Sequence, residues 1–275
     1  MTMAMVLNCA RSSGLLIHSS NNGGGSVIPK GIQLVQQEYA LLGIKPTALT
    51  VGPGRIRQHT NPFSLALSVP VEIPKWDQIF QDPTLPLTVD IGFGSGRFLL
   101  WFAKKFSQSN NYLGIEIRKG LVDRAKLWAM ELGLQNIYFM FANATTTFDQ
   151  LVDSYPGPLI FVSILCPDPY FKKRHHKRRV LQSSLVESIV KNLSPGGKVF
   201  IQSDVYEVAI EMRNRFDALF DVFDHVCDQN DDDGCLCDGN GWVLSNPMGL
   251  RTEREIHAES EGAKIYRRLY IKKLG

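Results

Sequence analysis

The sequence predicts an α/β protein with a doubly wound, mostly parallel sheet. From Pro83 onward, short apolar runs alternate with segments whose apolar residues recur at helical spacing. A glycine-rich turn, Gly92–Gly96, joins the first of these runs to the first such helix. Strands that alternate with helices in this way are typical of a parallel sheet covered on both faces. The chain of 275 residues has room for one such domain with short additions.

The first half of the predicted domain holds three strands and two helices. Leu85–Ile91 is an apolar run that ends in the glycine-rich turn, and Phe98–Phe106 has a helical pattern. Tyr112–Ile117 and Ile137–Ala142 are strand-like, the second being rich in aromatic and aliphatic residues. Between them, Lys119–Leu132 is expected to be a helix with one apolar face. That face consists of Leu121, Val122, Ala125, Trp128 and Leu132.

The second half continues the alternation. Two prolines, Pro167 and Pro169, end the fourth strand because proline cannot donate to a neighbouring strand. The turn sequence S-P-G-G at 194–197 separates a helix from the fifth strand. The strands expected here are Leu159–Leu165, Lys198–Ser203 and a closing strand Lys264–Lys272, and the helices are Val180–Leu193 and Glu207–Phe220.

The composition excludes several classes of protein. With 44% hydrophobic and 21% charged residues, the chain is neither wholly disordered nor a collagen nor a coiled coil. No stretch approaches the ~18 consecutive apolar residues of a membrane span, which predicts a soluble protein. The formal net charge of +3 is too small to indicate a nucleic-acid partner by itself. The five scattered cysteines imply no disulfide framework, and a reducing compartment is favoured.

The N-terminal segment differs from the rest of the chain. Its first acidic residue is Glu38, and before it stand two basic residues and five serines. Low acidity combined with serine and arginine is typical of an organellar transit peptide, and a flexible untargeted tail is the alternative. We therefore expect residues 1–45 to lie outside the fold and residues 46–275 to form the domain.

The turn after the first strand predicts a cofactor site. Gly92, Gly94 and Gly96 let the backbone turn tightly and approach a ligand closely. The spacing G-x-G-x-G differs from the dinucleotide fingerprint G-x-G-x-x-G, and the preceding Asp90 would repel a pyrophosphate. A cationic cofactor without phosphate, such as S-adenosylmethionine, would be attracted to Asp90. A tight turn without a ligand is the alternative.

Two further strand ends support this site. Glu116 ends the second strand, where an acid can accept hydrogen bonds from both ribose hydroxyls of an adenosine. Asn143 follows the third strand and is expected to hydrogen-bond the adenine edge. Ligands bind at the carboxyl ends of parallel strands, where these side chains are expected. Because Asp90 favours a cationic cofactor over a pyrophosphate, a methyltransferase fits better than a dehydrogenase.

A basic turn follows the fourth strand. Residues 172–179 contain six Lys or Arg residues and two His residues. Such density is self-repelling unless an anion lies against it, and a phosphate backbone is the usual anion. Tyr170 and Phe171 add rings that can stack on a base. A solvated basic face is the alternative, but the turn lies at the strand end where a substrate is expected.

An acidic segment, residues 221–238, contains seven Asp and no Lys or Arg. Its spacing fails the EF-hand template. Cys227, Cys235 and Cys237 with His225 lack the paired spacing of zinc sites, so no metal is expected. A solvated acidic loop is the interpretation.

Taken together, these motifs resemble a known family. D-I-G-F-G-S-G-R-F, G-I-E-I-R, C-P-D-P-Y-F-K-K-R-H-H-K-R-R, L-S-P-G-G-K-V-F-I-Q-S-D-V and T-E-R-E occur in the order found in bacterial-type tRNA (guanine-N7)-methyltransferases. The chain is most similar to the cyanobacterial and plant plastid forms, from about Arg55 to near Lys273. The resemblance implies a Rossmann-like class I fold, S-adenosylmethionine as methyl donor and tRNA as substrate.

The resemblance also implies roles for individual residues. Asp168 matches the aspartate between methyl donor and guanine, and it is the expected catalytic residue and a cofactor contact. The expected substrate-binding residues are Lys172, Asp204, Thr252 and Glu255. Since N7 of guanine has a free lone pair at neutral pH, no strong general base is needed. Carboxylates that accept hydrogen bonds from the base would stabilise the positive charge formed on methylation.

Two other functions remain open from the sequence. One is an inactive scaffold that binds RNA through the same fold. The other is a small-molecule methyltransferase, which would leave residues 172–179 without a purpose. We expect no membrane and no obligatory protein partner, a monomer or homodimer, and a location in the chloroplast or, as the second choice, the mitochondrion.

Overall fold

The computed structural model describes residues 29–44, 60–228 and 237–275. Within these ranges the chain forms a seven-stranded sheet in the order β3-β2-β1-β4-β5-β7-β6. The first five strands are parallel: β1 Leu87–Ile91, β2 Asn111–Glu116, β3 Ile137–Phe141, β4 Leu159–Leu165 and β5 Leu193–Ser203. Two antiparallel strands complete the sheet, β6 Phe223–His225 and β7 Tyr266–Lys272. The doubly wound, mostly parallel sheet is thus confirmed.

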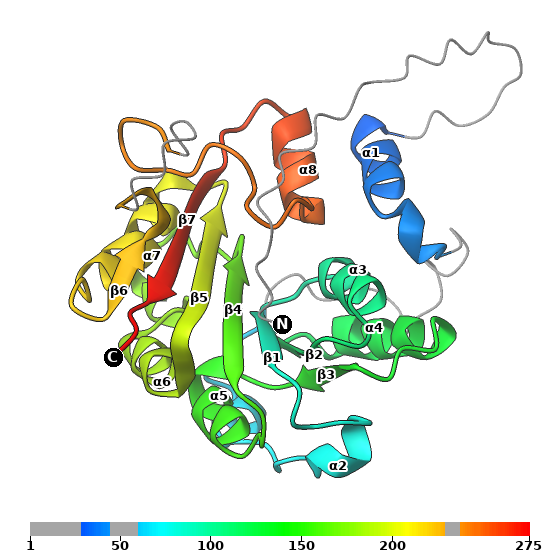
Figure 1. Ribbon diagram of the computed structural model, residues 1–275. Coiled ribbons are helices and arrows are strands. Elements are labelled where there is room, and N and C mark those ends of the chain that lie inside the picture. Colours follow the sequence, from blue (N-terminus) through cyan, green and yellow to red (C-terminus); the bar gives the residue numbers. More distant parts are fainter. Residues whose placement is uncertain (1–28, 45–59, 229–236) are drawn as a thin grey trace, which may run out of the picture.

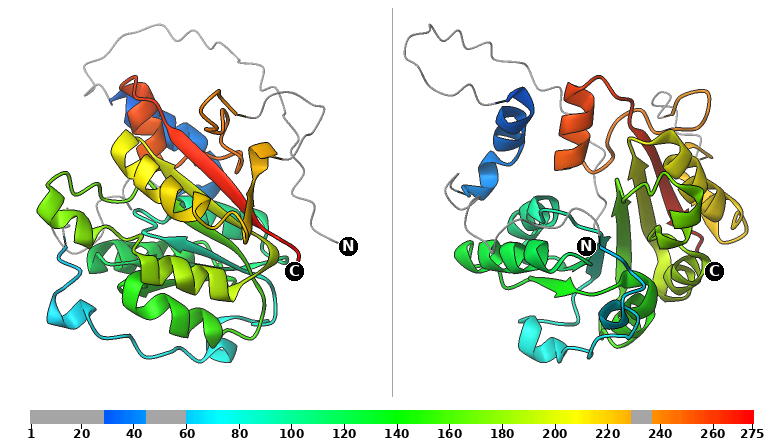
Figure 2. Two further views of the ribbon diagram at one scale, coloured as in Figure 1. Left: turned by 90° about the vertical axis from the view of Figure 1, so that its left-hand side faces the viewer. Right: turned by 180° about the vertical axis from the view of Figure 1, so that it is seen from behind.

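Helices cover both faces of this sheet (Figure 1 and Figure 2). The α-helices are α1 Lys30–Glu38, α2 Trp76–Ile79, α3 Arg97–Lys105, α4 Lys119–Glu131, α5 Ala144–Asp153, α6 Ser183–Asn192, α7 Tyr206–Asp217 and α8 Glu253–Ser260. Short segments of 3₁₀-helix are η1 Ala40–Leu42, η3 Leu65–Leu67, η4 Lys173–Arg178 and η5 Val226–Asp228. No helix in the described ranges is long and apolar enough to cross a bilayer.

Two hydrophobic clusters, one on each face, hold the layers together. One contains apolar residues of α5, α6 and α7, and the other contains those of α1, α3, α4 and α8. Strand β5 contributes to both, because Val199 and Ile201 lie in the first cluster and Phe200 lies in the second. Successive side chains of a strand point to opposite faces, so a strand that is apolar throughout belongs between two layers of helices.

Helix α5 was not expected. Its residues 145–147 are all threonines, whose branched side chains lower helix propensity. Asn143 starts the helix, since its Oδ1 accepts a hydrogen bond from the Thr145 N–H at 3.1 Å. Phe148, Leu151 and Val152 are buried at helical spacing and pack against the sheet.

The turn expected at residues 194–197 lies inside β5 as an interruption of its pairing with β4. Leu193 lies opposite Leu159, and Lys198 lies opposite Phe161. Four residues of β5 therefore face one residue of β4, and Gly196 has a φ of +74° that favours glycine. The prediction of a turn holds locally, although the strand begins before it.

The expectation that residues 1–45 lie outside the fold is wrong for residues 29–44. Helix α1 and η1 pack onto α8 and α3, and Val35 and Leu42 are 7% and 2% exposed. Figures 1 and 2 show α1 beside α8. Residues 1–28 of the expected transit segment lie outside the described residues.

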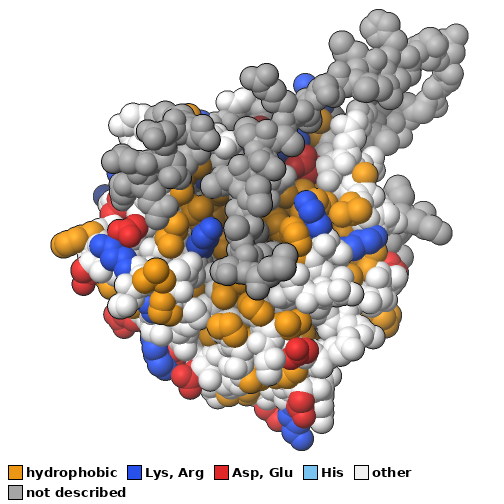
Figure 3. Space-filling model, in the orientation of Figure 1, with side chains coloured by type: hydrophobic (Ala, Val, Ile, Leu, Met, Phe, Trp, Pro, Cys, Tyr) orange, Lys and Arg blue, Asp and Glu red, His pale blue; other side chains and the backbone are white. Residues whose placement is uncertain are grey.

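Charges of both signs are spread over the face shown in Figure 3, with hydrophobic side chains between them. The near balance of positive and negative charge in the whole chain still leaves local differences along the sequence. The most basic of these is η4 with its flanking residues, and much of the acidic segment, residues 229–236, lies outside the described residues.

Candidate active site

Two adjoining cavities lie at the carboxyl ends of the parallel strands. The first has a volume of about 180 Å³ and is bordered by Glu116 and Asn143 at the ends of β2 and β3. The second, of about 250 Å³, lies between the turn after β1 and the start of α8. Their common wall consists of Gly92, Arg118, Cys166 and Asp168. This edge is where open α/β sheets bind ligands.

The glycine-rich turn leaves open space above its backbone. Gly92 and Gly94 have φ values of +79° and +60°, and a Cβ added at either would meet no atom within 4 Å. Gly96 differs, because its Cβ would lie 2.9 Å from Cβ of Ala125 on α4. Gly92 and Gly94 therefore face a cavity, whereas Gly96 allows α3 and α4 to pack closely and borders neither cavity.

Asp90 is buried beneath this turn and borders the second cavity. Its Oδ1 accepts a hydrogen bond from the Ser163 hydroxyl at 2.8 Å. Burial raises the pKa of Asp90 to about 7, opposed by the Ser163 hydrogen bond and assisted by the negative charge of Glu116. A cationic group in the cavity would favour the ionised carboxylate.

The raised pKa of Asp90 predicts that the unliganded protein loses stability as pH rises. The carboxyl has a pKa of 3.8 when unperturbed, so unfolding releases its proton between that value and about 7. Its contribution to stability is therefore fully present below pH 3.8 and is lost as pH rises through 7. Asp90→Asn cannot ionise and should lack this part of the pH dependence.

Thermal unfolding of both proteins in a pH series without ligand measures this effect. The exposed Asp77→Asn on α2 is the matched control and should follow the wild-type curve. Identical pH dependence of wild type and Asp90→Asn would contradict the prediction.

Glu116 is paired within the protein. Its side chain is 2% exposed and accepts hydrogen bonds from the Gly94 N–H at 3.2 Å and from Arg118 Nη2 at 2.9 Å. Burial lowers the pKa of Arg118, but the hydrogen bond and the charge of Glu116, together with the charge of Asp168, outweigh burial. The pKa of Arg118 is therefore raised. Arg118 lines both cavities, and sequence reasoning missed it although it follows Glu116 by two residues in G-I-E-I-R.

Asn143 borders the first cavity, but its amide bonds to the protein itself. Besides starting α5, it donates from Nδ2 to the carbonyl oxygens of Pro62 at 3.3 Å and Leu67 at 3.2 Å. This side chain thus holds residues 62–67 at the cavity. The expected contact with adenine stays a prediction.

Asp168 lies in a strained segment between the cavities. Cys166 and Tyr170, on either side of it, have φ values of 49° and 43°, a region that non-glycine residues rarely occupy. The Tyr170 hydroxyl donates to the Thr60 carbonyl at 3.1 Å, which fixes one end of the segment. Such strain persists where surrounding contacts hold the backbone, and it is frequent at active sites. Asp168 is the one predicted substrate or catalytic side chain that borders both cavities.

The basic turn forms η4 and borders the first cavity through Lys177, Arg178 and Arg179. Arg179 is only 5% exposed and donates to the Pro169 carbonyl at 2.8 Å and to Glu207 at 2.9 Å. It therefore holds the turn in place. The expected substrate residue Lys172 is exposed and borders neither cavity, so it lies on the outer side of the turn.

The expected substrate residues Asp204 and Thr252 lie near the start of α8. Asp204 accepts from Arg254 Nη2 at 2.5 Å and borders neither cavity. Thr252 is the N-cap of α8 and borders the second cavity. The Thr252 hydroxyl oxygen accepts a hydrogen bond from the Glu255 N–H at 3.1 Å. Capping of α8 therefore takes up one of the hydrogen bonds that this hydroxyl can make.

Glu255 bonds to the protein itself, and its expected contact with the nucleotide stays a prediction. Its side chain has no exposed area, and it accepts from Arg267 Nη2 at 2.5 Å and from Asn246 Nδ2 at 2.9 Å. It also accepts from Gln202 Nε2 and from the Thr252 N–H, both at 3.1 Å. With both oxygens engaged inside the protein, Glu255 fixes the start of α8 and does not face either cavity.

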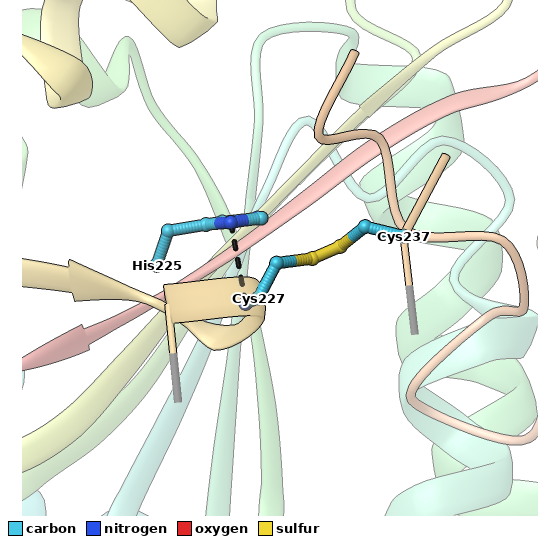
Figure 4. A group of neighbouring side chains, drawn as sticks. All are labelled: His225, Cys227 and Cys237. Carbon is cyan, nitrogen blue, oxygen red and sulfur yellow. Dashed lines mark hydrogen bonds between the residues drawn. A yellow bond between two sulfur atoms is a disulfide. The ribbon is translucent and has the colours of Figure 1, made fainter. Parts of the chain in front are cut away.

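A second cluster lies at the edge of the sheet, away from these cavities. Cys227 and Cys237 are joined by a disulfide across 10 residues, which the scattered cysteines did not predict (Figure 4). Among the described residues, His225 and these cysteines form a group with potential metal-ligand atoms within 4.8 Å of one another. However, His225 Nδ1 accepts from the Cys227 N–H at 3.3 Å and lies 3.2 Å from Arg268 Nη1. This arrangement, with paired sulfurs and a guanidinium beside the imidazole, presents no thiolate to a metal.

The chain is similar to several methyltransferases. A family model described as "Putative methyltransferase" matches residues 84–268. The tRNA (guanine-N(7)-)-methyltransferase of Synechococcus sp. strain JA-3-3Ab is 44% identical over 213 residues, 78% of this chain and 84% of that protein. The enzyme of that name from Synechococcus elongatus is 42% identical over 79% of this chain and 96% of its own length. A solved rRNA methylase from Streptococcus thermophilus is 12% identical with a TM-score of 0.42, covering 72% of this chain and 91% of its own.

Proposed function

The chain belongs to the family of tRNA (guanine-N7)-methyltransferases, and from this premise we propose the part that each site residue plays. The protein transfers a methyl group from S-adenosylmethionine to N7 of a guanosine in tRNA. The observation that carries the assignment of residues is the position of Asp168 between two adjoining cavities. A methyl donor and an acceptor base must meet at one such point.

The residues of the site fit the cofactor. S-adenosylmethionine supplies a methyl group on a positively charged sulfur. Gly92 and Gly94 leave the space that a closely bound ligand needs, and Asp90 offers a carboxylate to its cationic end. Glu116 and Asn143 border the first cavity, where they would contact the adenosine. Gly96 supports the site by allowing α3 to pack on α4.

Asp168 is proposed as the catalytic residue. N7 carries its own lone pair, so the protein needs to position the base and stabilise the positive charge that methylation creates. A carboxylate at the junction of the cavities does this without taking a proton from N7. Thr252 contacts the nucleotide from the second cavity, while Asp204 and Glu255 act as positioning residues through Arg254 and the start of α8.

One assay tests the function. The purified full chain is incubated with S-adenosylmethionine labelled in its methyl group and an unmodified tRNA transcript, and the digested RNA is separated into nucleosides. We expect the label in 7-methylguanosine. A parallel reaction with a small-molecule extract in place of tRNA detects the alternative substrate class. Label in another nucleoside, in small molecules only, or nowhere would contradict the assignment.

The basic turn is proposed to hold tRNA phosphates through Lys172, Lys177 and Arg178. Replacing Lys177 and Arg178 together by alanine should weaken tRNA binding and reduce the slope of log K against log salt by about 1 to 2, since each phosphate contact contributes about 0.7–0.9. Binding measured across a KCl series gives that slope. Lys191→Ala on α6, which pairs with Asp149, is the control and should leave the slope unchanged. An unchanged slope in the double variant would count against phosphate contact.

The cell compartment and the assembly state are further proposals. We propose that the N-terminal segment, with no acid before Glu38, directs the protein to the chloroplast. A fusion of residues 1–45 to a fluorescent protein that stays outside plastids would disprove this.

We also propose that the enzyme acts as a monomer or homodimer without an obligatory protein partner. An inactive purified chain that needs a second protein for tRNA methylation would disprove that.

A further inference from the structure

The segment that contains α1 and η1 is held against two helices that form the second cavity. Helix α1 packs closely on α8, because a Cβ at Gly31 would lie 2.5 Å from Nδ1 of His257. Glu38 accepts hydrogen bonds from the Arg251 N–H at 3.0 Å and from its Nη2 at 2.6 Å. Arg251 directly precedes Thr252, the N-cap of α8. The end of α1 is therefore tied to the start of α8.

The other end of the segment is tied to α3. Lys104 donates from Nζ to the Leu41 carbonyl at 2.9 Å, and a lysine is favourable at the carbonyl end of a helical turn. Leu42 is 2% exposed in the same hydrophobic cluster as Leu99 and Phe102 of α3. The segment thus bridges α3, which starts at the glycine-rich turn, and α8.

Tyr39 stands between these two attachments and borders the second cavity together with Asp90, Gly94 and Thr252. Its side chain is 5% exposed, and its hydroxyl donates to the Arg251 carbonyl at 2.6 Å. The ring therefore excludes water beside the buried carboxyl of Asp90. Exclusion of water lowers the local dielectric and strengthens the attraction between a carboxylate and a cationic ligand.

We propose that residues 30–42 are a positioning element for the methyl donor, and that Tyr39 is the residue through which they act. This inference rests on the proposed function, since it requires that the cationic end of the cofactor lies beside Asp90 in the second cavity. Tyr39 closes the side of the cavity that the sheet and the glycine-rich turn leave to the N-terminal segment. Cofactor binding and the packing of α1 on α8 then stabilise each other.

Calorimetric titration with S-adenosylhomocysteine, which binds without reacting, tests the proposal. Tyr39→Ala should raise the Kd about tenfold, equivalent to about 1.4 kcal/mol. Tyr39→Phe, which loses only the hydrogen bond to Arg251, should raise it about threefold, because the ring stays at the cavity but is no longer fixed to the start of α8. Leu41→Ala is the matched control, because that side chain is 49% exposed on the same segment and should bind as wild type does.

Two further readouts separate positioning from general stability. In steady-state assays Tyr39→Phe should raise the KM for S-adenosylmethionine and leave kcat and the KM for tRNA unchanged. Hydrogen–deuterium exchange of wild type should show slower exchange in residues 30–42 when S-adenosylhomocysteine is added. The exchange measurement needs no variant, so it decides the matter even if Tyr39→Ala does not fold.

The outcomes distinguish the two levels of inference. If the wild type binds no S-adenosylhomocysteine, the proposed function fails. If the wild type binds it, but Tyr39→Phe binds equally well and exchange in residues 30–42 does not change, the positioning role is overturned while the function stands.

Discussion

Asp168→Ala is expected to lower kcat by about 10²–10³-fold or more, the range seen when one preorganised electrostatic group is removed from an active site. The fold should survive, because Asp168 is only partly buried and lies after the end of β4. The loss is expected in kcat because the carboxylate stabilises charge that arises only as N7 is methylated.

Single-turnover methylation of a tRNA transcript measures this loss, and circular dichroism checks the fold. Asp168→Asn preserves the shape and removes the charge, so it should lose nearly as much activity as the alanine variant. Asp77→Ala, an exposed aspartate on α2, is the matched control and should keep full activity. Near-normal turnover of Asp168→Ala would show that the assignment of the catalytic residue is wrong.

Glu255→Ala is expected to lower the free energy of unfolding by about 3 kcal/mol, the low end of the cost of breaking a buried ion pair, because Arg267 keeps Glu259 as a second, more exposed partner. The remaining partner is Arg267, whose side chain is only 8% exposed. The Asn246 and Gln202 amides and the Thr252 N–H would lose their acceptor in the same place. Urea denaturation followed by circular dichroism measures the change.

The helix itself offers a control for Glu255. Glu259 lies one turn later on α8 and accepts from the same Arg267 Nη2 at 3.1 Å, but its side chain is 35% exposed. Glu259→Ala should therefore cost about 1 kcal/mol or less. If Glu255→Ala kept wild-type stability and lost only tRNA binding, the nucleotide contact implied by the family resemblance would be correct and the structural role wrong.

The parallel half of the sheet was predictable because burial on both faces forces each strand to be an apolar run. Strand β4 begins and ends as predicted at Leu159 and Leu165. The positions of Asp90, Glu116 and Asp168 at the cavities follow from the same pattern, since strand ends meet at one edge of the sheet. Which hydrogen bonds these side chains make could not be predicted from strand order.

Asn143 and Glu255 show why. Asn143 was interpreted as a ligand contact, yet it is also the N-cap of α5, and a helix there was hidden by three threonines. The sequence T-x-x-E of Thr252 and Glu255 is also the signature of a capping box, which the structure shows in full. In both cases one residue pattern fits a binding role and a helix start, and only the spatial partners distinguish them.

Other features depend on distant contacts that leave no local signal. The N-terminal segment has a composition typical of a tail, but two of its apolar residues, Val35 and Leu42, pack in one hydrophobic cluster with residues of α8 and α3. The pairing of Cys227 with Cys237 likewise depends on where the edge of the sheet turns, and cysteine spacing alone does not determine connectivity.

The position of β7 has a consequence for how the protein is made. Strand β7 lies between β5 and β6, although it follows both of them in sequence. During synthesis the parallel half can form early, but β6 has no neighbour to pair with until residues 266–272 leave the ribosome. Arg267 on β7 is also the ion-pair partner of Glu255. The start of α8 at the active site therefore cannot be completed before β7 has formed. The nascent chain therefore gains its complete site only after residues 266–272 have been made.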